Sequence, residues 1–109
     1  MNTTDVGKRA EAQAAAYLRC NGYQIIGQNW RIRYCEIDIV AIKNQIVYFV
    51  EVKYRSRSQQ GSGFDYITPA KLHRMEFAAK VWTQHHDWLG DYQLVAVEVQ
   101  PQKILMQII

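Results

Sequence analysis

Acidic and basic side chains recur at even spacing within an otherwise apolar segment, Cys35–Arg55, whose sequence is CEIDIVAIKNQIVYFVEVKYR. Because side chains alternate along a β-strand, Glu36 and Asp38 share one face of a predicted strand. Glu51 and Lys53 share one face of the next predicted strand for the same reason. A hairpin between the two strands would therefore gather three carboxylates and one amine.

The register of that hairpin decides which of these groups meet. With a two-residue turn at 44–45, Asp38 lies directly opposite Glu51, and Glu36 lies opposite Lys53. A four-residue loop preserves this register, whereas a three-residue loop breaks it. The other pairs expected along the hairpin are Lys43 with Ile46, Ile42 with Val47 and Val40 with Phe49.

Two facing carboxylates on an apolar surface need a compensating feature. Their Cβ atoms would be about 5 Å apart, so the like charges repel, and burial adds a desolvation cost. A bound cation, protonation of one carboxylate, or a buried ion pair with Lys53 would each relieve the conflict. Oxygen ligands without a nearby Cys or His pair favour Mg²⁺ or Mn²⁺ over zinc. Lys53 could then act on an attacking water or stabilise charge on a phosphate.

A fourth carboxylate is carried by the first predicted element, an Ala-rich helix. One of residues 3–5 can cap its start, and Asn21-Gly22 supplies a left-handed stop. Glu11 falls on the apolar stripe of this helix, so we expect its carboxylate to project toward the rest of the protein, where it could supply a further oxygen ligand. The residues that define the stripe are Gly7, Ala14, Ala15 and Leu18.

The remaining pattern predicts an α/β fold of helix, three strands, helix and two strands. Thr68 caps the second helix, Pro69 occupies its first position, and the helix ends near His85-His86. Both faces of the second and third strands are largely apolar, which is typical of the middle of a sheet covered on both sides. We therefore expect a central mixed sheet flanked by helices. The expected strands are Tyr23–Tyr34, Cys35–Lys43, Ile46–Tyr54, Tyr92–Gln100 and Lys103–Ile109.

Length and composition limit the functional classes. A chain of 109 residues fits a single domain over 1–109. It has no run of about 18 uncharged apolar residues, which excludes a helical membrane span, and no apolar leader at its start, so we expect a cytoplasmic protein. Cys20 and Cys35 lack metal-ligand spacing and are expected to be reduced thiols. The net charge of +3 leaves a polyanionic partner open.

Basic residues border the predicted carboxylate group on both sides in the sequence. Such residues would contact phosphates if the carboxylates lie within a nucleic-acid groove, whereas an ordinary solvated rim is the simpler interpretation of any single one. The candidates for phosphate contacts are Arg31, Arg33, Arg55, Arg57 and Lys71.

The ordered set of residues resembles the PD-(D/E)XK nuclease core: Asp38, then Glu51-Val52-Lys53 after thirteen residues, preceded by a helix that bears Glu11. More narrowly, Gly7–Lys80 resembles the bacterial YraN-like family of predicted endonucleases, which is similar to archaeal Holliday-junction resolvases. The matching pieces are Gly7-Lys8-Arg9-Ala10-Glu11, Tyr17-Leu18, Gly22-Tyr23, Asn29-Trp30-Arg31, Glu36-Ile37-Asp38-Ile39-Val40-Ala41, Phe49-Val50-Glu51-Val52-Lys53-Tyr54-Arg55, and Lys71 with Arg74.

The resemblance implies a restriction-endonuclease-like fold and a metal-dependent phosphodiesterase that acts on DNA, with branched or structured DNA among the substrates. Asp38 and Glu51 would ligate the metal, Mg²⁺ or Mn²⁺, with Glu11 as a further ligand. Lys53 would assist the nucleophile, and Glu36 would support the site.

Three alternatives stay open at this point. The chain could be a DNA-binding or adaptor module that keeps the fold without catalysis, or a protein-interaction domain in which the acidic residues form structural ion pairs. A homodimer is a further option, because a symmetric cut of two strands needs two copies of a single-site nuclease. One position departs from the family pattern: Cys35 stands where the family usually has Gly, whose absence could alter the entry to the strand.

Overall fold

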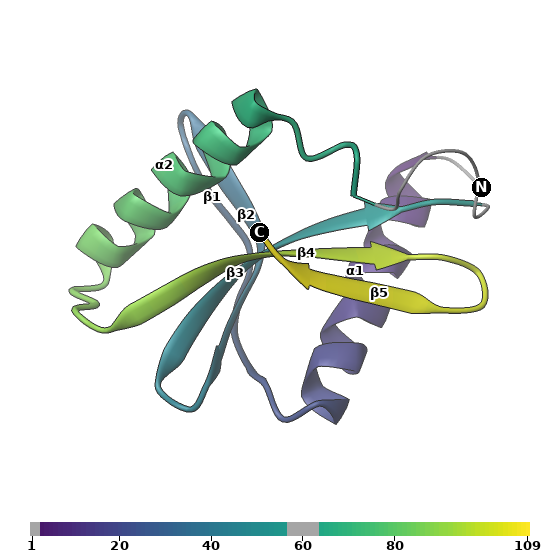
Figure 1. Ribbon diagram of the computed structural model, residues 1–109, viewed down its shortest axis with the longest axis horizontal. Helices are drawn as coiled ribbons and strands as arrows, with labels where there is room; N and C mark the ends of the chain where they lie inside the picture. Colours follow the sequence, from purple (N-terminus) through teal and green to yellow (C-terminus); the bar gives the residue numbers. More distant parts are fainter. Residues whose placement is uncertain (1–2, 57–63) are drawn as a thin grey trace.

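A five-stranded sheet lies between two helices in the computed structural model, which describes residues 3–56 and 64–109 (Figure 1). This is the predicted α/β order of helix, three strands, helix and two strands, and it is compatible with a restriction-endonuclease-like core. The elements are α1 (Thr3–Cys20), β1 (Gln24–Ile32), β2 (Cys35–Lys43), β3 (Ile46–Tyr54), α2 (Pro69–His85), β4 (Asp91–Val99) and β5 (Ile104–Ile108).

The strands lie in chain order across the sheet, from β1 at one edge to β5 at the other. β1, β2 and β3 form the predicted antiparallel meander. The connection through α2 returns the chain so that β4 runs parallel to β3, and β5 then pairs antiparallel with β4. The sheet is therefore mixed, and both β3 and β4 lie in its interior.

The two helices cover opposite faces of the sheet, as the apolar character of both faces of β2 and β3 predicts (Figure 1). Each face has its own core, and burial of such side chains contributes about 1.5–3 kcal/mol for each large one. The α1 side contains Ala10, Ala14, Ala15 and Leu18 of the helix with Ile39, Ala41, Val50, Val95, Val97 and Val99. The α2 side contains Ala78, Ala79 and Trp82 with Ile37, Val40, Val47, Phe49 and Leu94.

The predicted signals at the ends of α1 are partly confirmed. Gly22 has φ +88° and the Tyr23 N–H donates to the Leu18 carbonyl at 3.0 Å, which is the expected left-handed stop. The start differs, because α1 begins at Thr3 and includes residues 4 and 5 in its first turn. Glu11 is half-buried beside the buried stripe of this helix, so its carboxylate is held near the sheet.

The β2–β3 hairpin has the predicted turn and the predicted register over most of its length. Asn44 and Gln45 have φ +52° and +67°, values that suit a tight hairpin turn. Pairing runs from Lys43 opposite Ile46 to Ile39 opposite Val50. The two strands are therefore aligned as expected from the turn as far as Ile39, the residue that follows Asp38 in the sequence.

The start of α2 is fixed by its cap. The Thr68 side chain accepts a hydrogen bond from the Lys71 N–H at 3.2 Å, and Pro69 occupies the first turn as predicted. Lys71 is thus held in the first turn of the helix, next to the sheet.

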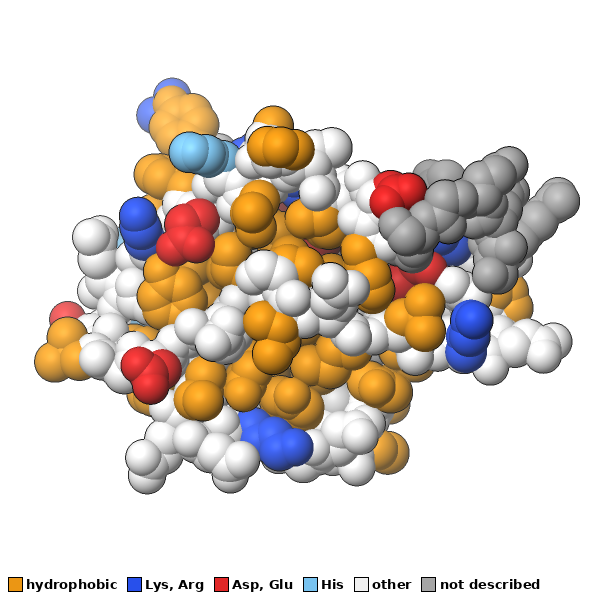
Figure 2. Space-filling model, in the orientation of Figure 1, with side chains coloured by type: hydrophobic (Ala, Val, Ile, Leu, Met, Phe, Trp, Pro, Cys, Tyr) orange, Lys and Arg blue, Asp and Glu red, His pale blue; other side chains and the backbone are white. Residues whose placement is uncertain are grey.

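The surface over β4 and β5 is rich in apolar side chains (Figure 2). Ile104, Leu105 and Met106 of β5 are half-buried, and Ile108 is 55% exposed. β5 is an edge strand, which leaves one side of its backbone without a neighbouring strand in the described chain. Neither described helix has the length and apolar composition required to cross a membrane.

Candidate functional site

Asp38 lies at an interruption of the sheet. Among the described residues of β2, it alone lacks a paired residue on either neighbouring strand. The pairing with β1 skips from Gln28 to Trp30, and the intervening Asn29 has the left-handed φ of +53°. On the other side, pairing with β3 ends at Ile39. Asp38 is therefore bridged to neither neighbouring strand, although the register of β1 with β2 is the same on its two sides.

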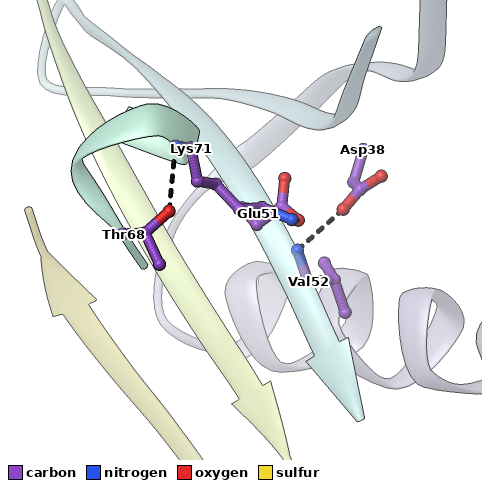
Figure 3. Close-up of polar contacts among 5 residues, drawn as sticks. All are labelled: Asp38, Glu51, Val52, Thr68 and Lys71. Atoms are coloured by element: carbon purple, nitrogen blue, oxygen red, sulfur yellow. Dashed lines mark hydrogen bonds and ion pairs between the residues drawn. The ribbon is translucent and has the colours of Figure 1, made fainter. Parts of the chain in front are cut away.

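The Asp38 carboxylate takes part in the sheet through its oxygen instead. The Val52 N–H donates to Asp38 Oδ2 at 2.8 Å, so the carboxylate contacts the backbone of the residue after Glu51 (Figure 3). The expected backbone pairing of Asp38 with Glu51 is absent from the described strands, because this side-chain bond takes the place of the ladder. Asp38 and Glu51 are nevertheless neighbours on adjacent strands.

The pKa of Asp38 is raised from its ordinary value of 3.8 to about 7. Burial is the largest cause, since it penalises the charged form. The negative charges of Glu51, Glu11 and Glu36 raise the pKa further, while the bond from Val52 N–H opposes the shift. The other three carboxylates predicted for the site therefore lie close enough to Asp38 to act on it electrostatically.

Glu51 is neutralised by a cation from α2. Lys71 Nζ lies 2.7 Å from Glu51 Oε2, and the two side chains are 31% and 22% exposed. Sequence reasoning considered Lys53 as the partner of these carboxylates, but the helix provides Lys71 instead (Figure 3). Helix capping by Thr68 fixes the position from which Lys71 reaches the strand.

An open cleft of about 390 Å³ lies beside Glu51. Cations and carboxylates share its walls, and the expected phosphate contacts Arg31, Arg33 and Lys71 are all among them. Arg31 pairs with Glu36 at 3.0 Å, a well-exposed contact worth little in stability. The residues that line the cleft are Arg31, Ile32, Arg33, Tyr34, Cys35, Glu36, Glu51, Lys71, Arg74 and Met75.

Lys53 and Arg55 are placed differently from the other candidates. Lys53 is exposed on β3, and its Nζ lies 5.8 Å from the centre of the Tyr66 ring. The expected pairing of Glu36 with Lys53 does not occur between the described strands, since Glu36 contacts Arg31 on β1. Arg55 is outside the walls of the cleft, and Arg57 lies outside the described residues.

A buried carboxylate that sequence reasoning missed explains the position of Arg55. Glu98 on β4 is fully buried, and its Oε1 lies 2.8 Å from Arg55 Nε, an ion pair without the alignment of a hydrogen bond. Gln100 Nε2 donates to the second Glu98 oxygen at 2.6 Å. The only available signal was a single charge in the apolar run Leu94–Val99 of a strand that proves to be central.

Tyr66 completes this group next to the cleft. Its ring centre is 5.6 Å from Arg55 Cζ, and its hydroxyl oxygen is buried with no hydrogen-bond partner in the described part of the chain. Burial raises the pKa of the Tyr66 hydroxyl above its ordinary value, and the charges of Glu98 and Glu51 raise it further.

The described residues contain no group of three or more possible ligands close enough together to hold a metal ion. Asp38 and Glu51 nevertheless provide the donor chemistry that Mg²⁺ takes, because Mg²⁺ commonly binds one or two carboxylates and completes its shell with water and substrate phosphate. Repulsion from the neighbouring carboxylates contributes to the raised pKa of Asp38, and a divalent cation would relieve that repulsion. The two carboxylates therefore fit such an ion, with Glu11 in range to act on it through its charge.

Comparison with known proteins decides the family. The family model described as "Uncharacterised protein family UPF0102" matches residues 10–99, which include Glu11, the whole meander and α2. The chain belongs to UPF0102. The resemblance to the YraN-like family noted in the sequence is confirmed, because the two are the same family.

UPF0102 proteins from several bacteria align with much of the chain. The UPF0102 protein of Leifsonia xyli subsp. xyli is 44% identical over 72% of this chain, and that of Chlorobium chlorochromatii is 41% identical over 74%. The aligned region spans 66% and 63% of those two relatives. A UPF0102 protein of Francisella tularensis subsp. tularensis is 33% identical over 85% of this chain and 80% of its own length.

Cys35, at the position where the resemblance leads us to expect Gly, is accommodated without a left-handed backbone. The described residues with left-handed φ are Asn29, Asn44, Gln45, Asp87 and Gly22, so the backbone at Cys35 does not require glycine. Its side chain is half-buried, packs against the α2 core and borders the cleft. The entry to β2 is therefore regular, and the irregularity lies three residues later, at Asp38.

Proposed function

We propose that this protein is a metal-dependent endonuclease that hydrolyses phosphodiester bonds of DNA in the cytoplasm, with Mg²⁺ or Mn²⁺ as its cofactor. The observation that carries the proposal is the contact of Asp38 with the backbone beside Glu51, at the edge of a cleft whose walls include four cations. An acidic pair beside a basic cleft, with Glu51 in the cleft wall, suits metal-assisted chemistry on a polyanion.

The side chains have distinct roles in this proposal. Asp38 and Glu51 would hold the cation, which supplies charge stabilisation to the phosphate under attack. Lys53, two residues after Glu51 on the same strand, has no ion pair among the described residues and would assist the attacking water or stabilise negative charge. Glu11 and Glu36 would tune the charge of Asp38 from two sides, as they do in raising its pKa.

The walls of the cleft would hold the substrate backbone. Arg31, Arg33 and Lys71 line it and would contact phosphates, which position DNA without reading its sequence. Recognition through backbone contacts favours DNA of a particular shape, and branched DNA is the class implied by the family resemblance. Arg55 is a weaker candidate for such a contact, because buried Glu98 already holds its guanidinium.

Cleavage assays test the proposal directly. Wild-type protein with Mg²⁺ or Mn²⁺ is incubated with duplex, flap, fork and four-way-junction DNAs. We expect cleavage of at least one, and a loss of at least about 100-fold in Asp38→Asn and Glu51→Gln. Asp91→Asn, which changes an exposed carboxylate at the start of β4, serves as the matched control and should cut normally. A wild-type protein that cuts none of these DNAs contradicts the proposal.

A DNA-binding module without catalysis is the second candidate, and the ion pairs of the cleft favour it. Both carboxylates that line the cleft, Glu36 and Glu51, are already paired with cations. Such a module would bind DNA with salt-dependent affinity, but its affinity would be indifferent to Mg²⁺ and to Asp38→Asn. Absence of DNA binding at physiological salt would instead indicate a protein-interaction domain.

A further inference from the structure

Lys71 is paired with one of the two carboxylate oxygens that Glu51 could offer to a metal ion. Its Nζ is 2.7 Å from Glu51 Oε2, a distance typical of a strong charge-assisted contact (Figure 3). The main chain of Lys71 is fixed by the Thr68 cap, whereas its four-carbon side chain is flexible. The ammonium group can therefore leave Glu51 while α2 stays in place.

The cleft beside this ion pair offers the Lys71 ammonium group an alternative position. Lys71 and Glu51 both line the open cleft, together with Arg31, Arg33 and Arg74. Arg31 is already paired with Glu36, and Arg33 stacks on Tyr34. A displaced Lys71 would remain among these cations, in a cleft that suits the phosphates of a nucleic acid.

A divalent cation and an ammonium group compete for the charge of a single carboxylate. Lys71 holds Oε2 of Glu51, and a divalent cation bound to either oxygen of the same group would lie close enough for the two positive charges to repel each other. Asp38 adds a second negative charge that a divalent cation can use and that Lys71 does not contact. Metal binding at Asp38 and Glu51 therefore favours release of Lys71.

We propose that Lys71 is an exchangeable counter-ion: it neutralises Glu51 in the metal-free protein and transfers to a DNA phosphate when a divalent cation binds. This inference rests on the proposed function. It makes Lys71 the residue through which metal binding and DNA binding affect each other. By linkage, a metal that releases Lys71 raises DNA affinity, and DNA raises metal affinity by the same factor.

The first test measures Mn²⁺ binding alone, by calorimetry at pH 8, which is above the Asp38 pKa of about 7. Lys71→Met removes the competing charge and keeps the side-chain bulk. We expect it to bind Mn²⁺ about fivefold more tightly than wild type, the ratio for an ion pair of about 1 kcal/mol. Arg74→Met removes a charge from the same cleft and the same helix without touching Glu51, and should stay within about twofold of wild type.

The second test measures DNA binding by fluorescence anisotropy with a labelled four-way junction, with and without Ca²⁺, which also takes oxygen ligands. Ca²⁺ should raise the affinity of wild type and Arg74→Met about fivefold, and that of Lys71→Met by less than about twofold. Thermal melting of each variant verifies that the fold is retained.

The outcomes separate this inference from the proposed function. Lys71→Met that binds Mn²⁺ no more tightly than Arg74→Met, or that keeps the full effect of Ca²⁺ on DNA affinity, overturns the exchange. Wild type that binds no Mn²⁺ overturns it as well. A protein that shows the exchange but cuts no DNA supports the role of Lys71 and contradicts only the nuclease activity.

Discussion

At the scale of single residues, Asp38 combines two opposing demands. Its carboxylate replaces a backbone group in the sheet by accepting from Val52, which favours the charged form. Burial and three neighbouring carboxylates favour the neutral form and prevail, which raises the pKa to about 7. Of the three remedies that the sequence left open for facing carboxylates, the raised pKa favours protonation of Asp38 below about pH 7, and Glu51 has a lysine partner, although the lysine is Lys71.

The raised pKa of Asp38 predicts how stability varies with pH. Because the folded-state pKa of about 7 exceeds the ordinary 3.8, the folded protein binds more protons than the unfolded chain between these values. The contribution of Asp38 to stability is therefore greatest below about pH 4 and is lost as pH rises to about 7. Asp38→Asn, which is never charged, should be more stable than wild type by about 1–3 kcal/mol at pH 8.

Urea unfolding of both proteins between pH 4 and pH 8, in buffer without divalent cations, measures this difference. The advantage of Asp38→Asn should shrink as the pH falls through 7. A difference that is constant with pH would show that the Asp38 carboxyl group has an ordinary pKa.

Among the charged residues that the structure describes, Glu98 is the one whose loss we expect to lower the free energy of unfolding most. Glu98→Ala leaves the largely buried Arg55 without its counter-charge, and removal of one partner from a buried pair costs about 3 kcal/mol. Glu36→Ala breaks the exposed pair with Arg31 and should cost less than about 1 kcal/mol. Free energies of unfolding from urea titrations compare the two. Equal losses would mean that Glu98 is not buried as described.

At the scale of elements, local signals predicted the helices, the order of helices and strands along the chain and most of the β2–β3 register. The turn at Asn44-Gln45 fixes that register, and alternation carries it as far as Ile39. The break at Asp38 was not predictable, because it depends on a bond between a side chain and a distant backbone group. The burial of Glu98 was missed for a similar reason: only the parallel pairing of β4 with β3, which joins residues far apart in sequence, makes β4 central.

A substitution in the β2–β3 turn is expected to increase the stability of the protein. Gln45 has φ +67°, which an L-residue adopts at a cost, and Asn-Gly is the preferred pair for such turns. Gln45→Gly should therefore stabilise the protein by about 0.5–1 kcal/mol. Gln93→Gly, which is an exposed position in the extended strand β4, should destabilise it by a similar amount. Thermal melting should show shifts of opposite sign, and a loss in both variants would contradict this account of the turn.

At the scale of the whole molecule, each face of the sheet has its own core, and the edge strands β1 and β5 have no further strand beside them in the described chain. α1 and α2 cover its faces, and the site lies where β2 and β3 open beside the start of α2. Separated from β3 by a single strand, the edge strand β5 carries a largely apolar surface (Figure 2). A second copy of the chain would find an unpaired backbone and an apolar surface at that edge.

We expect this edge to mediate a homodimer, which would give the proposed nuclease two sites for two strands. Ile108, 55% exposed on β5, is the position to change. Ile108→Lys should convert the dimer to a monomer without loss of fold, because the lysine remains in solvent. Sedimentation velocity of wild type, Ile108→Lys and the control Leu89→Lys, at an exposed residue outside the strands, measures this. A monomeric wild type contradicts the expectation.

The parallel pairing of β3 with β4 also governs when the site can form during synthesis. Glu11, Asp38 and Glu51 are translated before β4, yet β3 lacks its second neighbour, and Arg55 its carboxylate, until the residues of β4 have been added. A ribosome that stalls before Asp91 would thus release a chain that contains every proposed metal ligand and no completed sheet to hold them. Any activity of the cluster is in this way withheld from unfinished copies of the protein.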